Sequence, residues 1–120
     1  MIVDIEPIAK PRQTQSDKWK KRPIVQRYRA YKDQLRWSLL GQKVLAELPY
    51  EFKVVFHMSM PNGWSEKRKK QFHFTPHQQM PDIDNLLKGF MDALYAKDQM
   101  IYSIHVEKIW DYTGKINMEF

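Results

Sequence analysis

Residues 80–95 carry the strongest structural signal in this chain. A broad apolar stripe recurs there at helical spacing, formed by Leu86, Leu87, Phe90, Met91, Leu94 and Tyr95. Pro81 disfavours a helical conformation for the residue before it. Asp84 and Asn85 are both good N-cap residues, so we expect a helix to begin at about one of them. The segment therefore predicts an extended approach followed by a helix with one buried face.

The same segment concentrates acidic side chains in a chain that is otherwise basic. Asp82 and Asp84 would share one side of an extended approach, and Asp84, Lys88 and Asp92 would share one helix face. Two unit charges about 6 Å apart repel by about 3 kcal/mol at an effective dielectric constant of 20. A divalent metal with oxygen ligands offsets that repulsion most directly. The alternative is a solvated amphipathic helix in which Lys88 is an ordinary ion-pair partner.

The order of the residues along this segment favours a metal site over a solvated helix. The stretch PDIDNLLKGFMDAL followed by Asp98 resembles the signature of the RusA family of Holliday junction resolvases, with matches at Asp82, Asp84, Asn85, Leu86, Lys88, Asp92, Ala93, Leu94 and Asp98. The resemblance implies that Asp82, Asp84 and Asp98 bind Mg²⁺, with Mn²⁺ as a possible substitute. It also implies that these aspartates and Lys88 are catalytic. We expect Asn85 and Asp92 to support them, with Asp92 orienting Lys88.

Composition limits the remaining possibilities. The 120 residues are enough for one domain, which we assign to 1–120. The chain has no cysteine, which excludes disulfides and thiol catalysis. The sequence has no long apolar run of the kind that forms a signal peptide or a membrane span. We therefore expect a cytoplasmic protein. The net charge of +6 indicates an anionic partner, with nucleic acid the first candidate.

The positive charge is unevenly distributed. Residues 10–36 contain ten lysines and arginines against two aspartates, a net +8 that exceeds the charge of the whole chain. Such a segment can bind phosphates while an aromatic residue stacks on an exposed base. A second basic cluster is expected on a short helix over 65–72. The predicted DNA-binding residues are Lys10, Arg12, Lys18, Trp19, Lys20, Lys21, Arg22, Lys67, Arg68, Lys69 and Lys70. The alternative for both clusters is a solvated basic surface.

The remaining patterns predict an α+β fold. We expect a small mixed sheet of about four strands packed against two main helices, in the order β-α-β-α-β-β. A short strand around Val3 and Ile5 precedes a helix over 24–45, and residues 51–60 alternate as a strand. Residues 100–110 form a long strand that turns at 111–115 and pairs back with 116–120 as a hairpin.

Three histidines, His57, His73 and His77, lie near one strand and the following loop. Their spacing matches no standard zinc motif, so we interpret them as polar loop groups or neighbours of a phosphate.

These observations predict a magnesium-dependent endonuclease that resolves four-way DNA junctions in recombination and repair. The resemblance implies paired symmetric nicks with 5′-phosphate ends, a homodimer, and a bacterial or phage-infected host cell. Two alternatives remain open at this point. One is a branched-DNA-binding protein without catalysis, and the other is a metal nuclease with a different nucleic-acid substrate.

Overall fold

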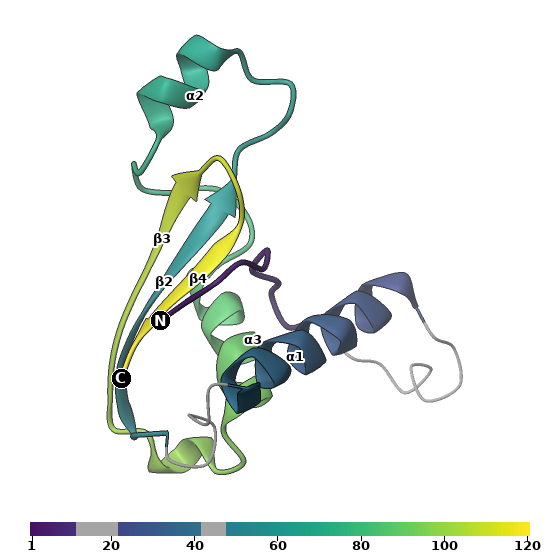
Figure 1. Cartoon of the computed structure of the whole chain (residues 1–120), viewed down its shortest axis with the longest axis vertical. Helices are drawn as coiled ribbons and strands as arrows, with labels where there is room; N and C mark the ends of the chain where they lie inside the picture. Colours follow the sequence, from purple (N-terminus) through teal and green to yellow (C-terminus); the bar gives the residue numbers. More distant parts are fainter. Residues whose placement is uncertain (12–21, 42–47) are drawn as a thin grey trace.

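The computed structural model describes residues 1–11, 22–41 and 48–120. It has the expected α+β fold, with one four-stranded sheet and helices beside it (Figure 1). The elements in chain order are β1 (Ile2–Val3), α1 (Pro23–Gly41), β2 (Glu51–Ser59), α2 (Glu66–Phe72), α3 (Ile83–Leu94), the 3₁₀ turn η3 (Asp98–Met100), β3 (Ser103–Asp111) and β4 (Lys115–Glu119). In this part of the chain, no helix is long and apolar enough to cross a membrane.

The strand order β1-β4-β2-β3 corrects one expectation. The predicted hairpin between the last two strands is wrong, because β4 pairs antiparallel with β2 and β3 pairs parallel with β2. The turn after Asp111 therefore carries the chain across β2. The run Val54, Val55, Phe56 explains the difference, since a strand with apolar residues on both faces is best placed in the sheet interior.

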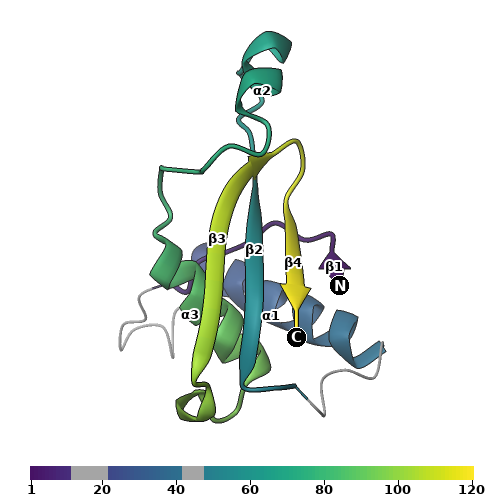
Figure 2. The same ribbon diagram turned by 90° about the vertical axis from the view of Figure 1, so that its left-hand side faces the viewer.

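Both main helices cover one face of the sheet (Figure 2). That face consists of alternate β2 residues, Phe52, Val54, Phe56 and Met58, together with Ile116 and Met118 of β4, all buried. Each fully buried side chain of this kind contributes about 1.5–3 kcal/mol relative to its exposed state. The helices supply the other half of the core through Tyr28, Tyr31, Leu35 and Leu39 of α1 and Leu86, Phe90, Ala93 and Leu94 of α3. The predicted apolar face of α3 is thereby confirmed, and the last residues of the predicted helix over 24–45, residues 42–45, lie outside the described part.

The segment before α1 crosses α3 at Gly89. A Cβ atom at that position would lie 3.0 Å from the carbonyl oxygen of Ile8 and 3.2 Å from the ring of Tyr28. Main-chain and side-chain contacts hold the crossing: the Lys10 N–H donates to the Asn85 oxygen at 3.2 Å, and the Tyr28 hydroxyl donates to the Gly89 oxygen at 3.2 Å. The crossing fixes the first two turns of α3, which carry the acidic motif.

The far end of the sheet is held by the buried carboxylate of Asp111. His57 Nδ1 lies 2.9 Å from one of its oxygens and His73 Nε2 lies 3.1 Å from the other, which also accepts the Tyr112 N–H at 2.7 Å. Burial alone would raise the pKa of Asp111, but these hydrogen bonds and nearby Lys115 outweigh it and lower the pKa. Because His73 directly follows α2, the network anchors the base of α2, which projects beyond the sheet (Figure 1).

Candidate active site

The acidic motif opens α3, one or two residues earlier than the sequence predicts. Asp82 is the N-cap in an extended conformation, with φ −66° and ψ 147°, and the helix begins at Ile83. Asp84 therefore lies in the first helical turn. The prediction that Asp82 and Asp84 lie on one side of an extended segment is wrong. Pro81 restricts only the residue before it, which leaves Asp82 free to act as the cap. The two carboxylates are brought together by the helix start instead.

Asp82 and Asp84 line a common hollow of about 630 Å³ with Lys108 of β3. Both aspartates are exposed, and neither makes a hydrogen bond or ion pair with the described residues. The positive end of the α3 dipole partly offsets their mutual repulsion. Their oxygens are hard donors of the type that magnesium prefers, and magnesium commonly uses one or two carboxylates plus phosphate oxygens. The two carboxylates thus fit a divalent cation of this type that keeps positions for further oxygen ligands.

Lys108 is the residue that the sequence interpretation missed. Its ammonium donates to the main-chain oxygens of Gln79 at 2.5 Å and Pro81 at 2.6 Å. It therefore fixes the segment immediately before Asp82. The only sequence signal was a lysine at a position where the strand alternation calls for a core residue, since Lys108 pairs in register with the fully buried Phe56. An ammonium has three donors, so one remains after the two carbonyl contacts.

Lys88 and Asp92 lie further along α3 but do not contact each other. Lys88 is exposed and has no ion-pair partner in the described residues. Asp92 binds the ammonium of Lys10 instead. The expected orientation of Lys88 by Asp92 therefore has no contact to support it. Lys10, predicted to contact DNA, is engaged in joining the N-terminal segment to α3.

Asp98 lies at the opposite end of α3 from Asp82 and Asp84, in the turn η3. Twelve helical residues separate the two ends, which corresponds to about 18 Å along the axis. Within residues 1–11, 22–41 and 48–120, no three His, Cys, Asp or Glu side chains are close enough to hold one metal ion. One chain thus brings two of the three expected carboxylates together and leaves Asp98 apart.

Of the two predicted DNA-binding regions, the structure describes little of the first and all of the second. Arg12, Lys18, Trp19, Lys20 and Lys21 lie outside the described residues, whereas the main-chain oxygen of Arg22 caps the start of α1. The predicted short helix is α2, in which Ser65 is the N-cap and accepts the Arg68 N–H at 3.2 Å. The Arg68 guanidinium lies 4.2 Å from the centre of the Trp64 ring. Lys67, Lys69 and Lys70 leave a positive surface on the projecting helix.

The three histidines are not brought together as metal ligands. His57 and His73 bind Asp111, as described above, and His77 is 5% exposed with its ring centre 4.2 Å from that of Trp110. The backbone of His77 joins β3 through an N–H donated to the Lys108 oxygen at 3.0 Å. Residues 74–77 thereby cover the outer edge of β3 and lead the chain toward the acidic motif.

Comparison with known proteins identifies one family. Residues 4–119, nearly the whole chain, match the family described as Endodeoxyribonuclease RusA. Comparison with curated proteins and with solved structures gave no significant match.

Proposed function

We infer that this chain, which belongs to the RusA family of Holliday junction-resolving endodeoxyribonucleases, uses magnesium to cut two strands of a four-way DNA junction symmetrically. Each cut would leave a 5′-phosphate and a 3′-hydroxyl. The enzyme would serve recombination and repair in the cytoplasm of a bacterial or phage-infected cell. The observation that carries the proposal is the hollow that the unpaired carboxylates of Asp82 and Asp84 line together with Lys108, whose ammonium is held by two carbonyls.

Asp82 and Asp84 would hold the metal ion. Their free oxygens and exposed position at a helix start leave room for water and a phosphate beside the ion. The chemistry that bound magnesium supplies is polarisation of a phosphoryl oxygen and activation of water. Removing the ion with EDTA should abolish cleavage while the fold persists, because neither Asp82 nor Asp84 is part of the hydrophobic core.

The two lysines near the motif have different proposed tasks. Lys108 holds residues 79–81 through two carbonyl contacts, and its remaining N–H would bind a non-bridging oxygen of the scissile phosphate. Lys88 is exposed one helical turn beyond Asp84 and would stabilise the charge that develops during attack. The positive surface of α2 would hold an arm of the junction, so binding should weaken steeply as salt rises.

A panel of labelled substrates tests this function. A four-way junction, a flapped duplex, a linear duplex and a structured RNA are each incubated with the protein in magnesium, and in calcium as a control. We expect the junction to be cut much faster than the others, with nicks at matching positions in opposite strands. Equal cutting of a flap or of RNA would assign a different nuclease, and tight junction binding without cutting in magnesium or manganese would assign a binding protein.

We further propose that Asp98 acts on the metal site of a second copy. Two symmetric nicks call for two active sites, and a two-fold dimer makes every contact reciprocal. Two α3 helices that run antiparallel across such an axis would set the Asp98 end of one beside the Asp82 end of the other. The exposure of Asp98 and its distance of a helix length from Asp82 support this arrangement.

Mixing two inactive variants tests the shared site. Asp82→Asn and Asp98→Asn should each lose cleavage, whereas their mixture should regain single-strand nicking. In a mixed dimer one site receives both substitutions and the other keeps both carboxylates. A mixture of Asp82→Asn with Asp84→Asn is the control and should stay inactive, since these residues share one site. Absence of nicking in the first mixture, or an active Asp98→Asn protein, would contradict the proposal.

A further inference from the structure

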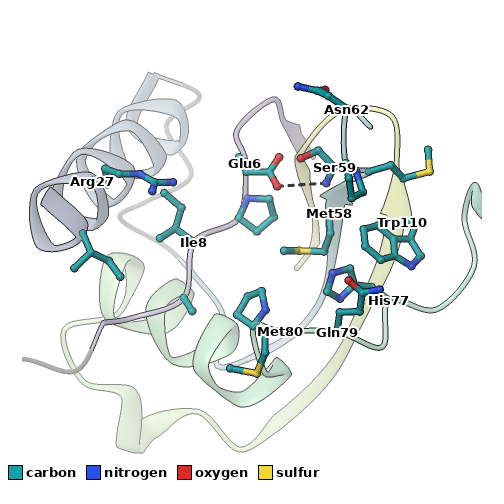
Figure 3. A pocket seen from close by; sticks show the side chains of 16 residues that line it. Glu6, Ile8, Arg27, Met58, Ser59, Asn62, His77, Gln79, Met80 and Trp110 are labelled. Atoms are coloured by element: carbon teal, nitrogen blue, oxygen red, sulfur yellow. Dashed lines mark hydrogen bonds between the residues drawn. The ribbon is translucent and has the colours of Figure 1, made fainter. Parts of the chain in front are cut away.

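A second hollow lies next to the one that holds the acidic pair, and the two share residues of the loop before α3. Figure 3 shows the second hollow and the side chains that line it. This hollow has a volume of about 600 Å³ and lies between the N-terminal segment, the end of β2 with its turn, and the loop that leads into α3. Gln79 and Met80 line both this hollow and the one that holds Asp82 and Asp84. A group in the second hollow would therefore be an immediate neighbour of a phosphate at the acidic pair.

The lining of this hollow combines apolar walls with a few polar groups. Met58, Met80 and Trp110 supply soft and flat apolar surface, and Asn62 and Gln79 supply amide donors and acceptors (Figure 3). Such a combination is typical of sites that bind a small organic group in a fixed orientation. Glu6 also lines the hollow, with one oxygen accepting the Ser59 N–H at 3.3 Å. Arg27 lines the hollow as well, so the lining has one charge of each sign and no net positive charge to attract a phosphate.

His77 gives the hollow an unexplained polar group. Its side chain lines the cavity and is almost fully buried, and Nδ1 is enclosed without a hydrogen-bond partner among the described residues. Burial lowers the pKa of His77 and nearby Lys108 adds to the effect, which favours the neutral form of the ring. An unpaired buried polar group destabilises a folded protein, and an apolar ring would fill this position without that cost.

We propose that this hollow binds an unpaired nucleobase next to the scissile phosphate. The inference rests on the proposed junction cleavage. A nucleobase has flat apolar faces for the methionine and tryptophan walls, and a polar edge for His77, Gln79 and Asn62. Extracting a base from a duplex breaks its stacking and pairing, and the cost is least where the base is already unpaired. Binding an unpaired base therefore favours the centre of a junction over an intact duplex.

Two measurements on the full-length protein test the base site. In the first, 2-aminopurine replaces each base at the junction centre in turn, and fluorescence is recorded in calcium, without cleavage. We expect a rise at one position beside the cut site. In the second, an abasic residue at that position should slow cleavage in magnesium by about tenfold.

Variants separate a binding role from a packing role. His77→Phe keeps a ring against Trp110 and removes the unpaired nitrogens, so its thermal stability should be unchanged or higher. It should nevertheless lose the fluorescence rise and the penalty for an abasic residue. Gln79→Ala, at an exposed position, should lose part of both. Gln71→Ala, an exposed glutamine of α2 away from the hollow, is the matched control and should behave as the wild type.

The outcomes distinguish this inference from the function on which it rests. Junction cleavage that is equally fast with an intact and an abasic residue, and without a fluorescence rise at any position, would overturn the base site and leave the resolvase standing. A fluorescence rise without cleavage in any divalent metal would support the base site and overturn the catalytic function.

Discussion

Asp82→Asn and Asp84→Asn are each expected to reduce junction cleavage at least about 100-fold while leaving junction binding intact. The two carboxylates share one hollow and have no partners among the described residues, so they are free to hold a cation. Loss of a metal ion removes several kcal/mol of charge stabilisation, and about 3 kcal/mol already corresponds to a hundredfold change in rate. Binding should stay the same or tighten, because each change removes a negative charge near the phosphate.

The measurement pairs single-turnover cleavage in magnesium with a gel-shift titration in calcium. Asp33→Asn, at an exposed position of α1, is the matched control and should cleave as the wild type. Thermal denaturation checks that the fold is intact. If Asp82→Asn and Asp84→Asn cleaved at near wild-type rates, the acidic pair would be no more than a solvated helix start.

Lys108→Met is expected to lower the cleavage rate about 10- to 100-fold, with a smaller effect on junction binding. The substitution removes the ammonium that fixes the main chain at Gln79 and Pro81, immediately before Asp82. It also removes one proposed phosphate contact, and a single lost electrostatic contact of this kind costs about 10²-fold in rate at strong sites. Because Lys108 also acts by positioning Asp82, weaker Mn²⁺ binding in the absence of DNA should accompany the slower cleavage.

Lys53→Met provides the control for that experiment. Lys53 lies on the neighbouring strand β2 but on the opposite face of the sheet from the helices, and it is half-buried. The Lys53→Met substitution should leave the cleavage rate and the Mn²⁺ affinity unchanged. An unaltered Mn²⁺ affinity in Lys108→Met, together with wild-type cleavage, would mean that the two carbonyl contacts are purely structural.

Local patterns predicted the helices and their buried faces well. The stripe from Leu86 to Leu94 reaches the core as expected, because helical spacing alone decides which side chains share a face. Strand pairing was harder to predict. The short connection between β3 and β4 suggested a hairpin, but the doubly apolar β2 occupies the place between them. Which strands pair depends on the burial of a third strand, and a local pattern does not contain that information.

The candidate site shows the same difference between local patterns, which could be predicted, and contacts between distant segments, which could not. Asp82 and Asp84 are two residues apart in the sequence, so their proximity could be predicted from the motif. Lys108 joins them only because β3 runs beside the start of α3, a contact between distant segments. Asp98 belongs to the same motif but lies beyond a helix whose length sets it apart from the pair. Spacing along the chain therefore identified the acidic residues without giving their arrangement in space.

A plasmid that extrudes a cruciform tests the central claim most directly. The cruciform presents one four-way junction in a closed circle, and two nicks in opposite strands during one binding event convert it to a linear molecule. We expect the wild-type protein in magnesium to yield linear DNA, with little nicked circle accumulating first. Nicked circles alone, or an uncut plasmid in both magnesium and manganese, would contradict a dimeric resolvase built on Asp82 and Asp84.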